Sequence, residues 1–125
     1  MSKPTVAILG ASRDRRKYGN KSVRAHRQQG YEVFPVNPHA DEIEGLKAYP
    51  DLASVPGGPL DRISVYLPPD VAIGLLEEIQ SRGAKEVWFN PGSDSPALVA
   101  RAEALGLDII RACSIVDVGV SPAML

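Results

Sequence analysis

A glycine-containing turn followed by a cluster of cations is the first part of the chain whose residue types could do chemistry. The turn is Gly10-Ala11-Ser12, and the five residues after it hold four cationic side chains: Arg13, Arg15, Arg16 and Lys17. Gly10 lets the backbone turn sharply and lets a ligand approach closely. Backbone N–H groups and the Ser12 hydroxyl can donate to phosphate oxygens, and a following helix adds a positive field at its N-terminus. These residues indicate a phosphate site, with a surface turn carrying solvated charges as the alternative.

The charge of the chain is segregated along its length, although the formal net charge is only −1. Residues 1–30 hold eight Lys/Arg and one acid and carry +7, whereas residues 31–125 carry −8. Such segregation suggests an anionic partner for the N-terminal part, with a solvated basic helix face as the alternative. Nucleic acid is not expected as that partner, because the whole chain is slightly acidic and the basic stretch contains one aromatic residue, Tyr18.

Short apolar runs bounded by Gly, Pro or Asn predict the strands that must position this turn. The run 5–9 is continuously apolar, as expected of a strand that is buried on both faces. Four further strands are predicted, at 32–36, 61–67, 86–89 and 107–110.

Capping residues and helical spacing predict the segments between the strands. Helices are expected in three places: over 19–29, from a cap at Asp70 to Gly83, and from a cap at Ser95 to Gly106. Residues 37–60 are expected to be irregular apart from a short strand-like piece within 43–49, and the residues after 110 to form a short tail.

The alternation of strands and helices predicts the fold class. It indicates an α/β, Rossmann-like, doubly wound parallel sheet of about five strands in three layers, with right-handed crossovers. A chain of this length is expected to form one domain over residues 1–125. Ligands of such sheets bind beyond the carboxyl ends of the strands. The predicted site is therefore built from the loops 10–18, 37–40, 67–71 (which includes Val71) and 90–94.

The turn is a poor match to the fingerprint of a dinucleotide site. That pattern has glycine at three positions, and here Ser12 and Arg15 occupy two of them. A NAD site also has an acid at the end of the second strand, where this chain has Val36-Asn37. The nearby His39 is a poor partner for the extra phosphate of NADP at neutral pH. A small NAD(P)-dependent oxidoreductase or another nucleotide-binding enzyme is therefore the second hypothesis.

Several motifs, in order along nearly the whole chain, resemble one known family. They are Val6–Ser12, the stretch Gly30-Tyr31-Glu32-Val33-Phe34-Pro35-Val36-Asn37-Pro38, then Gly45–Pro50, Leu67-Pro68-Pro69 and Trp88–Gly92. The chain resembles the stand-alone CoA-binding domain proteins, which are similar to the N-terminal domain of the succinyl-CoA synthetase α subunit. The resemblance implies coenzyme A, or an acyl-CoA, as the ligand.

The resemblance also implies where CoA would lie. Ser12 and the residues after it would hold the phosphates, and Asn37-Pro38 with the following His39 would line the adenosine end. Leu67-Pro68-Pro69 would pack along the adenine and the start of the pantetheine. Asn90 and Gly92 would lie nearer the thiol end. His26 and Arg27 depart from the family, because apolar helix residues are expected there, so either one of them faces the sheet or the helix is short and loosely packed.

No group in the chain clearly performs covalent or acid–base catalysis. His39 is expected at the rim of the site, His26 in a helix, and Cys113, at the end of the fifth strand, is interpreted as a small buried hydrophobe. A lone cysteine and two distant histidines indicate neither a disulfide nor a metal site, and no apolar run could span a membrane. The first hypothesis is therefore a cytoplasmic CoA-binding protein without catalysis of its own, acting as a carrier, a sensor or a partner subunit of an unknown protein.

Overall fold

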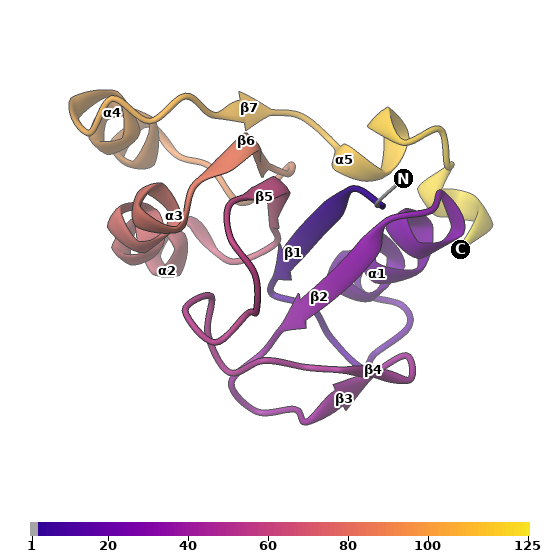
Figure 1. Cartoon of the computed structure of the whole chain (residues 1–125). Helices are drawn as coiled ribbons and strands as arrows, with labels where there is room; N and C mark the ends of the chain where they lie inside the picture. The colour runs from indigo at the N-terminus through magenta and orange to yellow at the C-terminus, as the bar shows by residue number, and fades with distance from the viewer. Residues whose placement is uncertain (1–2) are drawn as a thin grey trace.

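A five-stranded, fully parallel sheet runs through the structure, a computed structural model that describes residues 3–125 (Figure 1). The strand order is β2-β1-β5-β6-β7. The bounds are Thr5–Leu9 for β1, Glu32–Val36 for β2, Leu60–Val65 for β5, Ala84–Phe89 for β6 and Ile110–Arg111 for β7. The predicted sheet of about five parallel strands is confirmed.

Helices cover both faces of this sheet. Helix α1 (Tyr18–Gln28) and the short α5 (Ser114–Asp117) lie together on one face (Figure 1). On the other face lie α2 (Pro69–Ala72), the 3-10 helix η1 (Ile73–Leu75), α3 (Leu76–Arg82) and α4 (Pro96–Ala104). The three-layer, doubly wound arrangement is therefore also confirmed.

Strand β1 shows why its sequence is continuously apolar. Ala7 and Leu9 pack into the core on the α3 and α4 face, and Val6 and Ile8 pack into the core under α1. All four side chains are at most 2% exposed. A strand buried on both faces has no solvent-facing side on which polar residues could alternate.

The strand order creates a crevice at one end of the sheet. From β1 the chain winds to β2 on one side, and it then returns to β5 on the other side of β1. Helices leave in opposite directions at such a switch point, so a space remains beyond the carboxyl ends of the strands.

The segment between β2 and β5 contains a small hairpin where one strand-like piece is predicted. β3 (Glu42–Ile43) and β4 (Leu46–Lys47) pair antiparallel, and Ile43 packs into the core under α1. Beyond the hairpin, Tyr49 returns to bridge Val36 at the outer edge of the sheet.

The predicted helix from Asp70 to Gly83 differs in two ways. The helix begins at Pro69, so Asp70 lies in its first turn and does not cap it. Proline at the first helical position is preorganised for a helix and needs no N–H acceptor there. The helical path is also divided into α2, η1 and α3, whereas the cap predicted at Ser95 is confirmed by its bond from the Leu98 N–H.

Strand ends follow the pairing available to them. β5 ends at Val65 rather than at residue 67, because the registers with Leu9 and Phe89 both end there. β6 begins at Ala84 rather than at residue 86, paired with Leu60. β7 enters the sheet only at Ile110, since the preceding residues pack against the core without pairing.

The predicted C-terminal tail is wrong, because the segment folds back over α1. It forms α5 and the 3-10 helix η2 (Pro122–Met124), and Ser114 and Ile115 are 0% exposed. Cys113 is half-buried just before α5 and does not end a strand. No helix within residues 3–125 is long and apolar enough to cross a bilayer.

Candidate ligand-binding site

The main cavity of the described residues lies at the switch point and has a volume of about 890 Å³. All four predicted loops contribute to its wall. The predicted site residues found there are Gly10, Ala11, Ser12, Lys17, Val36, Asn37, Pro38, His39, Leu67, Pro68, Pro69, Val71 and Gly92.

Sequence reasoning missed one wall and several neighbours of predicted residues. The lining residues outside the predicted loops are Leu9, Gly19, Pro50, Asp51, Leu52, Tyr66, Leu75, Glu78 and Ile79. Tyr18, Pro91 and Ser93 lie within the predicted loops but were not singled out. Helical spacing from Val71 could have found Leu75, Glu78 and Ile79. Pro50 ends one of the family motifs, but that motif does not place it at the site, and no local signal marks Asp51 or Leu52, because only the return of the chain past the hairpin brings residues 50–52 to the cavity.

The turn after β1 is built by two close backbone approaches. Gly10 has φ +88°, and a Cβ there would lie 2.9 Å from the Tyr66 carbonyl oxygen. A Cβ at Gly19, in the first turn of α1, would collide with the Gly10 carbonyl. Within residues 3–125 the N–H groups of Ala11 and Ser12 donate to no other group. The turn therefore offers backbone donors next to the N-terminus of an eleven-residue helix, which is a suitable anion site.

Ser12 is oriented by its own loop. Its Oγ accepts a hydrogen bond of 3.0 Å from the Asp14 N–H, which leaves the hydroxyl proton to donate elsewhere. The Asp14 carboxylate in turn accepts hydrogen bonds from Arg16 Nε at 3.1 Å and Nη2 at 3.0 Å. These hydrogen bonds lower the pKa of Asp14 to about 2, so the carboxylate is ionised at neutral pH.

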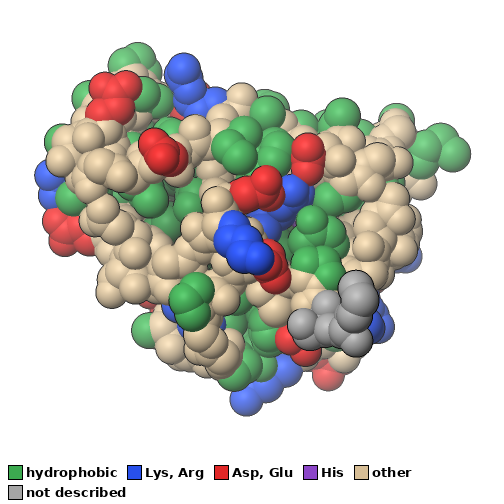
Figure 2. Space-filling view, turned by 45° about the horizontal axis from the view of Figure 1, so that its top comes forward, with side chains coloured by type: hydrophobic (Ala, Val, Ile, Leu, Met, Phe, Trp, Pro, Cys, Tyr) green, Lys and Arg blue, Asp and Glu red, His purple; other side chains and the backbone are tan. Residues whose placement is uncertain are grey.

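Three of the four predicted loop cations do not line the cavity. Arg16 pairs with Asp14, the Arg15 Nε lies 3.5 Å from a Glu44 oxygen, and the Arg13 Nε donates to the Glu42 carbonyl at 3.3 Å. Lys17 does line the cavity. Cations and acids are also interspersed on the face shown in Figure 2. The charge segregation along the sequence therefore does not produce four cations directed at the cavity, because local carboxylates and carbonyls bind three of them.

Asn37 joins the two loops that flank the turn. Its Nδ2 donates to the Ala11 carbonyl at 2.8 Å, and its Oδ1 accepts from the His39 N–H at 2.7 Å. The amide thus holds the β2 loop against the β1 loop, and His39 is exposed at the rim as predicted.

Asn90 does not line the cavity, contrary to its predicted place at the thiol end. The side chain is 1% exposed; its Nδ2 donates to Ser64 Oγ and the Val65 carbonyl, and its Oδ1 accepts from the Ser114 N–H. A buried amide must satisfy its donors and acceptor, and this one does so within the core. Its role is to fix the start of the 91–93 loop, which does line the cavity.

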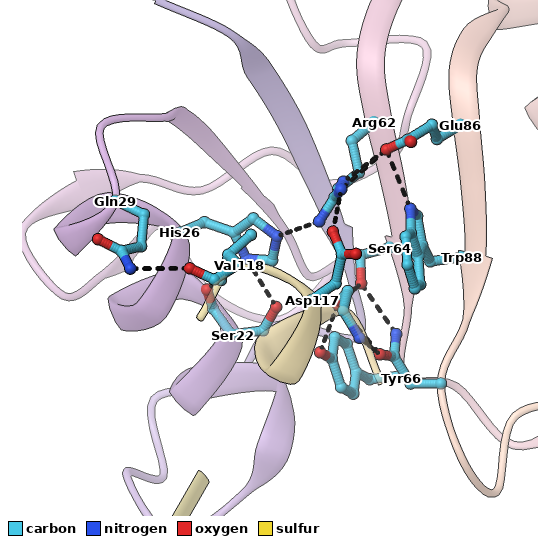
Figure 3. A network of polar contacts seen from close by, with 12 residues as sticks. Ser22, His26, Gln29, Arg62, Ser64, Tyr66, Glu86, Trp88, Asp117 and Val118 are labelled. Atoms are coloured by element: carbon cyan, nitrogen blue, oxygen red, sulfur yellow. Dashed lines mark hydrogen bonds and ion pairs between the residues drawn. The ribbon is translucent and has the colours of Figure 1, made fainter. Parts of the chain in front are cut away.

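A polar network on the α1 face of the sheet lies behind the part of the cavity wall that Tyr66 and the 91–93 loop form (Figure 3). Arg62, 4% exposed, donates to Glu86 at 2.8 Å and Asp117 at 2.7 Å, and so ties β5 to β6 and α5. Tyr66, a lining residue, bonds Ser114 at 3.0 Å through its hydroxyl, and burial raises the pKa of this phenol. His26 is 0% exposed and faces this network, whereas Arg27 is exposed. Of the two alternatives for α1, the structure therefore shows the one in which one of these two residues faces the sheet.

Arg82 holds the missed wall of the cavity. From the end of α3 its guanidinium donates to the carbonyls of Leu52 at 3.1 Å, Pro56 at 2.9 Å and Gly58 at 3.0 Å. This one guanidinium thus anchors an irregular loop that pairs with no strand. Leu52 is 3% exposed and contributes to both the cavity wall and the core.

A parallel sheet with a donor-rich turn at its switch point is an arrangement suited to an anionic, nucleotide-like ligand. The family model described as "CoA binding domain" matches residues 4–119, and the chain belongs to that family. The resemblance found in the motifs is therefore confirmed.

Relatives of two kinds match the chain. A conserved hypothetical protein from Pyrococcus furiosus has a solved structure that is 34% identical, with a TM-score of 0.80, covering 93% of this chain and 99% of that one. The uncharacterized protein YneT of Bacillus subtilis is 31% identical over 87 residues, 70% of this chain and 64% of YneT. An ADP-forming acetate–CoA ligase II of Archaeoglobus fulgidus is 34% identical over 83 residues, 65% of this chain but 12% of the ligase. The chain thus matches under two thirds of YneT and only a small part of the ligase.

Proposed function

We propose that the chain binds coenzyme A in the cavity at the switch point. The observation that carries this proposal is the β1–α1 turn, whose unpartnered N–H groups, Ser12 hydroxyl and Lys17 belong to residues that line a largely apolar cavity. CoA has the matching chemistry, with a pyrophosphate and a 3′-phosphate at one end and an apolar pantetheine chain. The family match and the ligase relatives support the same ligand.

The loops suggest how CoA would be oriented. The phosphates would lie at Ser12 and Lys17, the adenosine along Asn37-Pro38 and His39, and the pantetheine past Leu67-Pro68-Pro69 toward Gly92. Asn90 would act by holding the 91–93 loop rather than by touching the thiol end.

We further propose that the chain has no catalysis of its own and acts as a carrier, a sensor or a partner subunit. Within residues 3–125 the His39 side chain makes no hydrogen bond, and Cys113 is not among the cavity residues. Neither residue thus provides the nucleophile paired with a base that covalent catalysis needs. A cytoplasmic location stays a prediction.

A ligand panel tests the proposal. Thermal unfolding is measured with CoA, acetyl-CoA, dephospho-CoA, NAD, NADP and ATP, because a ligand at about 100 times its Kd stabilises by about 2.7 kcal/mol. CoA or acetyl-CoA should raise the midpoint most. A larger shift with NAD or NADP would favour the oxidoreductase hypothesis instead. Incubation with acetyl-CoA should release no free thiol beyond the rate without protein.

Lys17 and Arg16 provide a matched pair of variants in the same loop. Lys17→Ala should weaken CoA binding by about tenfold, or about 1.4 kcal/mol, because Lys17 lines the cavity. Arg16→Ala should change the affinity by less than about twofold, since its guanidinium is bound to Asp14. Titration calorimetry measures both, and equal effects of the two substitutions would contradict this placement of the phosphates.

A further inference from the structure

Two of the four cations after Ser12 are already paired with carboxylates of this chain. Arg16 bonds Asp14 in its own loop, whereas the partner of Arg15 is Glu44, which comes from the distant β3–β4 turn. Within residues 3–125 no carboxylate lies within 4.0 Å of the Arg13 or Lys17 nitrogen atoms. Internal pairing therefore reduces the positive charge that this loop can offer to a ligand.

Glu44 is held firmly in an unfavourable backbone conformation. Its φ is +51°, and no other non-glycine residue within 3–125 has a positive φ. Glu44 and Gly45 form a two-residue hairpin turn in which both residues have positive φ. Such turns favour Asn or Gly at the first position, so a glutamate there is less favourable for the turn. The Glu44 carboxylate is 20% exposed and accepts 3.1 Å from Asn20 Nδ2, while its carbonyl accepts 2.7 Å from Arg27.

The Asn20 side chain connects the Glu44 carboxylate to a residue that lines the cavity. The same Asn20 Nδ2 that binds Glu44 also donates to the Ser12 carbonyl at 2.8 Å. Ser12 and Gly19, the residue before Asn20, both line the cavity. Because Asn20 Nδ2 lies 3.1 Å from a Glu44 carboxylate oxygen and 2.8 Å from the Ser12 carbonyl oxygen, these two oxygens are at most about 6 Å apart. A negative charge there acts on a phosphate bound at the turn, since the turn lies within about one Debye length of ~8–10 Å.

We propose that Glu44 is an internal counter-ion that competes with ligand phosphate for the cations of the 13–17 loop, and so limits the affinity for CoA. This inference rests on the proposed function. While Glu44 holds Arg15, the ligand must bind without that guanidinium and against the field of the carboxylate. Binding that recruits Arg15 must first break the Arg15–Glu44 pair.

Glu44→Gln is the test variant, because it removes the charge and keeps the length of the side chain. Glu42→Gln is the matched control: it removes a charge from the same hairpin, and the Glu42 side chain is exposed and makes no ion pair within residues 3–125. Titration calorimetry at low and physiological salt should show CoA bound about threefold or more tightly by Glu44→Gln at low salt, a difference of about 0.7 kcal/mol. The gain should shrink with salt. Dephospho-CoA should gain less than CoA.

The remaining measurements separate the possible outcomes. In an Arg15→Ala background the part of the Glu44→Gln gain that comes from competition for Arg15 should disappear, and only the effect of removing the field of the carboxylate should remain. A wild-type chain that binds no CoA refutes the proposed function, and this inference with it. Wild-type binding with Glu44→Gln unchanged, or matched by Glu42→Gln, overturns this inference alone. If Glu44→Gln unfolds, Glu44→Gly removes the same carboxylate and suits the positive φ, so it replaces Glu44→Gln in the comparison.

Discussion

Acidification should destabilise the protein through His26, a buried base. The imidazole is 0% exposed and packs edge-on against Tyr31 at 5.0 Å between ring centroids. Its Nε2 lies 3.4 Å from the Arg62 guanidinium (Figure 3). Burial lowers the pKa of His26 from its ordinary 6.5 to about 4, because the charged form loses its hydration. The hydrogen bond to the Ser22 carbonyl opposes this effect, and the Arg62 charge adds to it.

The sign and size of the pH effect follow from these two pKa values. Between pH 6.5 and about 4 the unfolded chain has bound a proton at His26 and the folded chain has not. The free energy of unfolding therefore falls as the pH falls through this range, and the contribution of His26 is fully present above it. The whole difference corresponds to about 3 kcal/mol, of which about 2 kcal/mol is lost between about pH 7 and about pH 4.5.

Urea unfolding at these two pH values, followed by circular dichroism, measures this loss. His26→Gln keeps a polar side chain that does not titrate, so the variant should lose about 2 kcal/mol less than wild type between the two pH values. The comparison cancels the contributions of carboxylates with lowered pKa values, such as Asp14 and Asp61. Equal losses in the two proteins would refute the reasoning. So would a wild-type imidazole NMR titration with its midpoint above about pH 6.

Further predictions concern the loop anchor and the turn. Arg82→Ala should weaken CoA binding by about threefold or more, because the cavity wall at Leu52 loses its anchor. Arg101→Ala, which breaks an exposed pair with Glu77, should leave CoA binding unchanged, and titration calorimetry compares the two variants. Gly19→Ala should lower the free energy of unfolding by about 2 kcal/mol or more through its collision with the Gly10 carbonyl. Gly74→Ala, where a Cβ meets nothing within 4 Å, should leave it unchanged or raise it, and a Gly19→Ala protein as stable as Gly74→Ala would contradict the close approach.

Local signals in the sequence were enough to predict the strands of the main sheet, the turn after β1 and the other three loops at the site. The continuous apolar run of β1 and the cap at Ser95 act over a few neighbouring residues, and both are found in the structure. The switch point follows from the order of the elements, because the winding rule for parallel sheets does not depend on side-chain detail. The motifs between Val6 and Gly92, among them Gly30–Pro38, also indicated the family that the match over residues 4–119 confirms.

The tertiary structure alone decided which predicted residues face the cavity and what lies behind them. Of the four cations in residues 13–17, only Lys17 lines the cavity, because Glu44, Glu42 and Asp14 bind the others. Asn90 turned inward because Ser114, 24 residues later, supplies its donor. Residues 50–52 became a wall because Arg82, 30 residues beyond Leu52, holds their loop. Each outcome depends on contacts between segments far apart in the chain, and a residue's local sequence does not contain the identity of such partners.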